Sequence, residues 1–247
     1  MSAAVITTWP ADLLLAGIVL LGATVQRMSG IGFALVAAPG LIAMEGPASG
    51  VLLSNFASCL ISAIGLATAW RGLKPRLMVP LVLAALCTVP LGTWAAARLS
   101  RTALLIGIGL IVCAAAAVIA RSVRLSALHG RSGAMIAGAA SGFMNASAGV
   151  GGPPVALYAL NAGWSAAELV PNALFYGVVV NAMSVLLKGF PRLPARALAC
   201  SGGALAVGLL LGGYLSTRVP ERWARRFVLV LATVGGLVTL AKGIAGL

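Results

Sequence analysis

Acidic residues are almost absent from this sequence. Its 247 residues include four Asp and Glu and one His, against 17 Lys and Arg. Paired carboxylates for acid–base catalysis, or a histidine cluster for a metal, therefore have few residues from which to form. The four cysteines show no Cys-x-x-Cys spacing, and no Walker-type nucleotide loop occurs. We accordingly expect no catalytic residue, no metal and no cofactor.

Hydrophobic residues make up 61% of the chain, and the mean hydropathy is +1.07. Apolar runs of 20 or more residues are typical of transmembrane helices, so the sequence predicts an all-α integral membrane protein embedded in the lipid bilayer. A net charge of +13 would suggest nucleic acid in a soluble protein. In a membrane protein, short basic loops set the topology instead, so we expect no nucleic-acid partner.

Short polar segments divide the chain into eight apolar runs, which predict about eight transmembrane helices. The first and fifth runs exceed the roughly 20 residues that a straight span needs. Each is therefore either a bent crossing or a crossing followed by a re-entrant piece. The runs cover residues 11–44, 47–70, 77–97, 102–120, 132–161, 166–187, 194–216 and 227–247.

Loop charges suggest an orientation. If each run crosses once, ten Lys and Arg lie on the side of the N-terminus and six on the other side. The excess of positive charge on cytoplasmic loops then predicts a multi-pass inner-membrane protein with both termini in the cytoplasm. The first ten residues contain no Lys or Arg, unlike the basic start of a secretory signal.

Two glycine-rich breaks interrupt the first and fifth runs. The first reads Ser29-Gly30-Ile31-Gly32-Phe33, and the second reads Ala148-Gly149-Val150-Gly151-Gly152-Pro153-Pro154. Gly30 corresponds to Gly149 and Gly32 to Gly151, at an offset of 119 residues. Main chain that leaves the helix at membrane depth must be buried in protein or line a cavity, so paired breaks point to a binding site.

Further markers repeat at almost the same offset. Arg71-Gly72 corresponds to Lys188-Gly189, 117 residues later, and Leu91-Gly92 to Leu211-Gly212, 120 residues later. The chain therefore reads as two homologous repeats of four segments, residues 1–125 and 126–247. Four crossings in each repeat would make the repeats parallel, and a re-entrant piece in each would make them inverted.

The breaks predict an anion site. Free N–H groups at the start of a half-helix, together with the helix dipole, attract negative charge. Arg27 lies inside a membrane segment and is the strongest single candidate for pairing with an anion. The alternatives are glycine kinks that serve tight packing, and an Arg27 side chain that reaches the membrane surface. The predicted substrate-binding residues are Gln26, Arg27, Ser29, Gly30, Gly32, Asn55, Asn145, Ser147, Gly149, Gly151, Gly152, Pro153, Asn172 and Tyr176.

The chain resembles the sulfite exporter TauE/SafE family of membrane permeases over nearly its whole length. The resemblance rests on Gly30-Ile31-Gly32-Phe33 with Pro39, and on Ser141-Gly142-Phe143, the Gly149–Pro154 element and Tyr158. Members often carry a double glycine in the first break, where Phe33 stands here. The resemblance implies transport of small sulfur-containing anions, such as sulfite or sulfonates, across the inner membrane.

The leading hypothesis is therefore a secondary permease for a small anion, bound near the midplane between the two breaks. One alternative is an integral membrane enzyme acting on a lipid or a small precursor, and another is a non-transporting partner of a membrane complex. The spacings Gly138-x-x-x-Gly142 and Gly208-x-x-x-Gly212 allow close helix contact. They would serve either packing within the chain or the interface of a homodimer.

Overall fold

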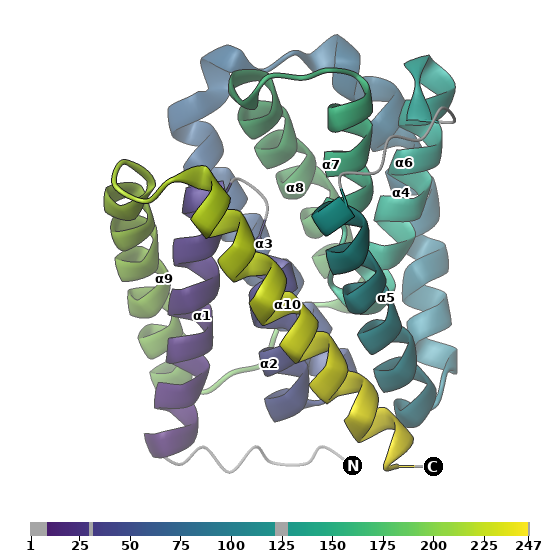
Figure 1. The fold of residues 1–247 in the computed structure, drawn as a ribbon. Coiled ribbons are helices and arrows are strands. Elements are labelled where there is room, and N and C mark those ends of the chain that lie inside the picture. Colours follow the sequence, from purple (N-terminus) through teal and green to yellow (C-terminus); the bar gives the residue numbers. More distant parts are fainter. Residues whose placement is uncertain (1–8, 30–31, 122–127, 247) are drawn as a thin grey trace.

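The computed structural model describes residues 9–29, 32–121 and 128–246, with side chains at all of these positions except 29, 166, 221, 222, 224 and 225. Within these residues the chain is helical and forms no strand (Figure 1). The elements are α1 (Trp9–Ser29), α2 (Phe33–Glu45), α3 (Pro47–Ala69), the 3₁₀ turn η1 (Trp70–Gly72), α4 (Pro75–Arg98), α5 (Arg101–Arg121), α6 (Gly130–Ala148), α7 (Gly152–Asn161), α8 (Ala166–Lys188), α9 (Ala195–Ser216) and α10 (Glu221–Ile244).

Seven of these helices are long and apolar enough to cross a membrane: α1, α3, α4, α5, α8, α9 and α10. The prediction of an all-α, multi-pass membrane protein is confirmed. The eight predicted runs correspond to more helices than expected, because the first run divides into α1 and α2 and the fifth into α6 and α7. Of the described residues between these helices, Gly32 and residues 149–151 are not helical.

The short helix α2 turns back along α1. A Cβ added at Gly22 would lie 2.9 Å from the Cβ of Ala37, and one added at Gly40 would lie 3.0 Å from Ile18. Contacts that ascend on one helix while they descend on the other mark an antiparallel pair. The helix α7 likewise returns beside α6 (Figure 1). The long first and fifth runs are therefore each a helix followed by a shorter returning helix.

This geometry differs from the arrangement of loops expected with one crossing in each run. The extra reversal at α2 carries the turn between α3 and α4 to the end of the molecule opposite the start of α1 (Figure 1). The start of α6 lies at that opposite end as well (Figure 1). The prediction of cytoplasmic termini was based on a count of loop charges with one crossing in each run. That count does not apply to a chain that turns back at α2 and α7.

Glycines bring two pairs of parallel helices into backbone contact. A Cβ added at Gly138 of α6 would lie 2.1 Å from the carbonyl oxygen of Leu81 on α4. One added at Gly208 of α9 would lie 2.6 Å from the carbonyl oxygen of Leu20 on α1. Both small-residue spacings therefore serve packing inside the chain, where a side chain would force the helices apart.

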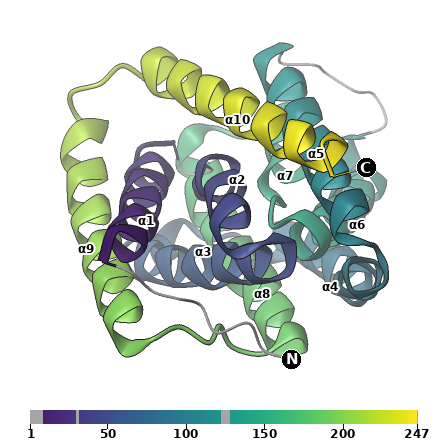
Figure 2. The ribbon, with the colours of Figure 1, turned by 90° about the horizontal axis from the view of Figure 1, so that it is seen from below.

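Three buried clusters surround the breaks. The first joins α1, α2, α3 and α9 through residues such as Phe33. The second joins α4, α6, α7 and α8 through residues such as Leu81. The third joins α1, α2 and α3 to α5, α10 and Val150 of the second break through residues such as Ile108. Seen from the end where α1 begins, α9 flanks α1 on the outside and α10 runs across towards α5 (Figure 2). Each cluster thus combines helices from both halves of the chain.

The order of reversals can be tested by labelling introduced cysteines in intact cells. In a variant whose four native cysteines are replaced by alanine, we expect Arg76→Cys and Arg218→Cys to react with an impermeant thiol reagent from one side of the membrane. Ser100→Cys should react from the other side, because α4 runs from Arg76 to the opposite end of the molecule (Figure 1). Labelling of Arg76→Cys and Arg218→Cys from opposite sides would contradict this fold.

Candidate functional site

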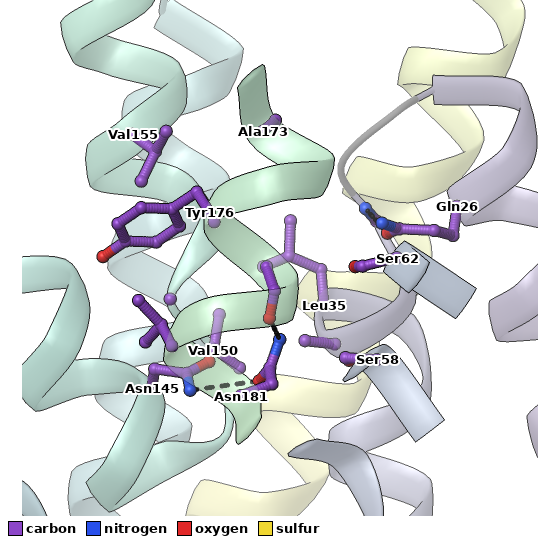
Figure 3. Close-up of a pocket in the computed structure, with 16 residues that line it drawn as sticks. Gln26, Leu35, Ser58, Ser62, Asn145, Val150, Val155, Ala173, Tyr176 and Asn181 are labelled. Carbon is purple, nitrogen blue, oxygen red and sulfur yellow. Dashed lines mark hydrogen bonds between the residues drawn. The ribbon is translucent and has the colours of Figure 1, made fainter. Parts of the chain in front are cut away.

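The two helix breaks line a single cavity (Figure 3). About 60 Å³ of it is open to the centre of a water-sized molecule. Residues from α1, α2, α3, α6, α7 and α8 contribute, so segments more than 100 positions apart in the sequence meet here. The lining consists of Gln26, Gly32, Ala34, Leu35, Ser58, Ser62, Asn145, Val150, Gly151, Gly152, Val155, Ala173, Tyr176, Gly177, Val180 and Asn181.

Both short helices begin at this cavity. Gly32 precedes the first residue of α2, and Gly151 precedes the first residue of α7. The positive ends of two helix dipoles are thus directed at one space. Pro153 and Pro154 have no N–H, which leaves the amides of Gly151, Gly152 and Val155 as the donors at the start of α7. Such convergent backbone donors favour a negatively charged ligand.

Gln26 caps the start of α2. Its Oε1 accepts hydrogen bonds from the backbone N–H of Gly32 at 2.8 Å and of Phe33 at 2.9 Å. Gln26 lies near the end of α1 and reaches across the break, so a single side chain joins the two helices (Figure 3). A side-chain oxygen therefore satisfies two of the donors that an unpaired helix start would leave open.

Asn145 organises the corresponding end of α6. Its Nδ2 donates to Oδ1 of Asn181 at 3.1 Å and to Oγ of Ser184 at 3.2 Å. Its carbonyl oxygen accepts from Nδ2 of Asn55 at 3.3 Å and from the N–H of Gly149 at 2.9 Å. Gly149 has φ +73°, the left-handed conformation that often ends a helix and suits glycine. The network ties α6 to α3 and α8 around the break.

The cavity lining repeats at one offset. Gln26 and Asn145, Gly32 and Gly151, Ser58 and Gly177, and Ser62 and Asn181 are each separated by 119 residues, and all eight line the cavity. The helices that carry them also begin at nearly constant offsets, between 119 and 121 residues. Each half of the chain thus supplies a related set of positions to the same space.

The described lining has a neutral polar part and an apolar part, and it contains no charged side chain. Amides and hydroxyls of Gln26, Ser58, Ser62, Asn145 and Asn181 form the polar part. The side chains of Leu35, Val150, Val155 and Val180 form the apolar part. Such a surface can hold a small ion by hydrogen bonds and still accommodate a short apolar substituent.

One cation lies directly behind the second break. The ammonium of Lys188, the last residue of α8, donates to the carbonyl oxygen of Ala146 in the last turn of α6. Ala146 follows Asn145, which lines the cavity. The position 119 residues earlier holds Ala69, so this charge belongs to the second half of the site alone. Its field favours negative charge near the start of α7.

Six predicted site residues line the cavity: Gln26, Gly32, Asn145, Gly151, Gly152 and Tyr176. Four others lie next to it without lining it. Asn55 and Gly149 bond to the Asn145 carbonyl, Ser147 bonds to the Phe143 carbonyl, and Pro153 is buried in the first turn of α7. Gly30 and the side chain of Ser29 lie outside the described residues.

Arg27 does not reach the cavity. Its side chain is exposed and crosses α9, where a Cβ added at Gly213 would lie 3.9 Å from its Nε. Successive helical residues point about 100° apart, so the face that directs Gln26 inward directs Arg27 outward. Arg27, the strongest single candidate from the sequence, therefore packs against α9.

Asn172 also lies away from the cavity. Its Oδ1 accepts from the N–H of Lys74 at 2.9 Å, and its Nδ2 donates to the carbonyl of Glu168 at 2.7 Å. It fixes the turn before α4 to the first turns of α8. The pairing of Asn55 with Asn172 used an offset of 117, whereas the cavity residues of α3 and α8 correspond at 119.

Three polar lining residues were not among the predicted site residues: Ser58, Ser62 and Asn181. A signal for two of them was present. Applying the offset of 119 from the glycine breaks to the following helices pairs Ser62 with Asn181, two polar residues in otherwise apolar runs. Ser58 pairs with Gly177, and that correspondence is visible only once α3 and α8 are seen to face the same space.

The described residues form a helical membrane protein in which two short helices start at one polar cavity, and discontinuous helices of this kind occur in many membrane transporters. The family model described as Sulfite exporter TauE/SafE matches residues 14–239. The chain belongs to this family, whose members are membrane transporters. Comparisons with curated proteins and with solved structures gave no match.

The network around Asn145 can be tested by a double-mutant cycle. We expect Asn145→Ala and Asn181→Ala each to lower the thermal unfolding midpoint of the purified protein, because each breaks a buried hydrogen bond. The loss of stability in the double variant should be smaller than the sum of the two single losses, by a coupling free energy of about 0.5–2 kcal/mol. Asn145→Ala combined with Asn172→Ala serves as the control and should be additive. Additivity in both pairs would contradict the network.

Proposed function

We propose that this protein is a secondary transporter that moves a small sulfur-containing oxyanion or organosulfonate across the inner membrane. The observation that carries the proposal is the meeting of two helix starts at one cavity, lined by Gly32 on one side and by Gly151 and Gly152 on the other. Membership of the TauE/SafE family supports the transport of sulfur anions.

The chemistry of the cavity favours a small anion as the substrate. Backbone N–H groups and side-chain amides supply donors, and the dipoles of α2 and α7 supply positive potential. Lys188 adds a positive charge from behind the second break. The apolar side chains of Leu35, Val155 and Val180 provide room for the organic part of a sulfonate. Small oxyanions and short sulfonates share the charged head group that these features recognise.

The two halves, residues 1–125 and 126–247, are best described as inverted repeats. Each half contains five α-helices in corresponding order, which begin 119 to 121 residues apart. Corresponding helices run in opposite directions, as α3 and α8 do where they pack antiparallel (Figure 1). An odd number of helices in each half inverts the second copy, and such inverted halves commonly bind substrate at their interface near the midplane.

The recounted loop charges favour an orientation opposite to the one that the sequence suggested. Among the described residues, the end away from the start of α1 carries nine Lys and Arg, and the end where α1 begins carries six. This excess favours a cytoplasmic location for the turn between α3 and α4. The start of α1 and the end of α10 then face the other side. The cysteine-labelling experiment described above reads this orientation directly.

The transport function can be tested in liposomes containing the purified protein. Gly151→Leu should abolish movement of labelled sulfite, because the added side chain collides with Asn145, whose Cβ would lie 2.7 Å from a new Cβ. Gly202→Leu, at an exposed glycine with nothing within 4 Å, is the control and should transport normally. Equal transport by both variants would reject the cavity as the route.

Lys188 supplies a second test, based on charge. We expect Lys188→Gln to weaken binding of thiosulfate, a divalent anion, by about tenfold, and to weaken binding of monovalent methanesulfonate less. Arg27→Gln removes a charge that faces α9 and is the matched control, with near-normal affinity. Thermal stabilisation of the purified variants by each anion measures the affinities. A larger effect of Arg27→Gln than of Lys188→Gln would overturn the assignment.

A further inference from the structure

The cap on α2 places an oxygen where an anionic ligand would bind. The Oε1 of Gln26 lies 2.8 Å from the N of Gly32 and 2.9 Å from the N of Phe33, and Gln26 and Gly32 both line the cavity. An oxyanion bound at a helix start is held by this same arrangement of two adjacent backbone donors. The protein thus presents its own oxygen to one of the two helix starts.

The corresponding residue behaves differently in the second half. Asn145 occupies the position 119 residues after Gln26 but has one methylene fewer. Its side-chain amide donates away from the break, to Asn181 and Ser184. The start of α7 instead has two prolines, which reduce the number of donors in need of a partner. The capping side chain is therefore a feature of the α2 end of the cavity alone.

We propose that Gln26 is an internal surrogate for the substrate, whose carboxamide oxygen the anion displaces when it binds. This inference rests on the proposed function and adds an anion site at the Gly32 and Phe33 amides, with Gln26 as a competitor for it. Without a ligand, Gln26 satisfies the α2 donors and stabilises the empty cavity. With an anion bound, the side chain rotates away and the α2 amides hold a substrate oxygen.

The competition sets a limit on affinity. Each anion that binds at α2 must break two hydrogen bonds that the empty protein already has, so part of the gross binding free energy is lost. A transporter needs this balance, because a ligand that is held too firmly is not released. A variant that removes the competing oxygen should consequently bind the anion more tightly and be less stable when empty.

The experiment compares three variants with the wild type, using sulfite and methanesulfonate as probes and thermal stabilisation and calorimetry as readouts. Gln26→Ala should bind both anions about tenfold more tightly, the equivalent of one to two net hydrogen bonds, and should unfold at a lower temperature when empty. Gln26→Glu should do the reverse, because a tethered carboxylate binds the helix start more strongly than a carboxamide does. Thr24→Ala, two residues before Gln26 on the same helix and with its hydroxyl bonded to the Leu20 carbonyl, is the control and should keep the wild-type affinity.

Weaker anion binding in Gln26→Ala would show that Gln26 is a direct ligand, and unchanged binding would show that the anion does not use the α2 end. Either result overturns this inference and leaves the proposed function standing. Absence of anion binding in both the wild type and Gln26→Ala would reject the proposed function and this inference together. If Gln26→Ala does not fold, the anion affinity of Gln26→Glu tests the inference instead. Tighter anion binding by that variant would contradict competition between the side chain and the anion.

Discussion

The need to pair every backbone N–H and C=O inside a membrane governs the structure around the cavity. A helix that stops within the bilayer leaves several such groups without intrahelical partners, and lipid supplies none. Here the last turn of α6 is satisfied by Asn55, Lys188 and the N–H of Gly149, and the first turn of α2 by Gln26. The polar residues that surround the cavity are thus first of all a means of stabilising interrupted helices.

The two breaks meet this requirement in different ways. At α2 a long side chain supplies the missing acceptor, whereas at α7 two prolines remove donors that would otherwise need one. The residues that carry the remaining donors at α7, Gly151, Gly152 and Val155, line the cavity. Related positions in the two halves have therefore diverged, and the divergence lies in the atoms that would contact a ligand.

The sequence predicted the membrane class and the family, because these depend on composition and on glycine and proline patterns. Gln26, Asn145 and Gly151, which the offset of 119 links with their partners, line the cavity, and their contact with a substrate stays a prediction. The sequence was wrong about the position of Arg27, because the rotation of a helix about its axis is set by packing against α9. It left the number of reversals open, since periodicity does not reveal whether a chain turns back at a break.

The packing clusters indicate which parts could move during transport. One cluster unites α1, α2 and α3 with α9, and the other unites α6, α7 and α8 with α4. Each contains one helix from the other half of the sequence, joined through glycines that allow backbone contact. Motion of one half of the sequence against the other would separate α1 from α9 and α6 from α4, which are the tightest contacts. A third cluster joins α1, α2 and α3 to α5, α10 and Val150 of the second break. The boundary near residue 125 in the sequence is therefore not a boundary in the packing.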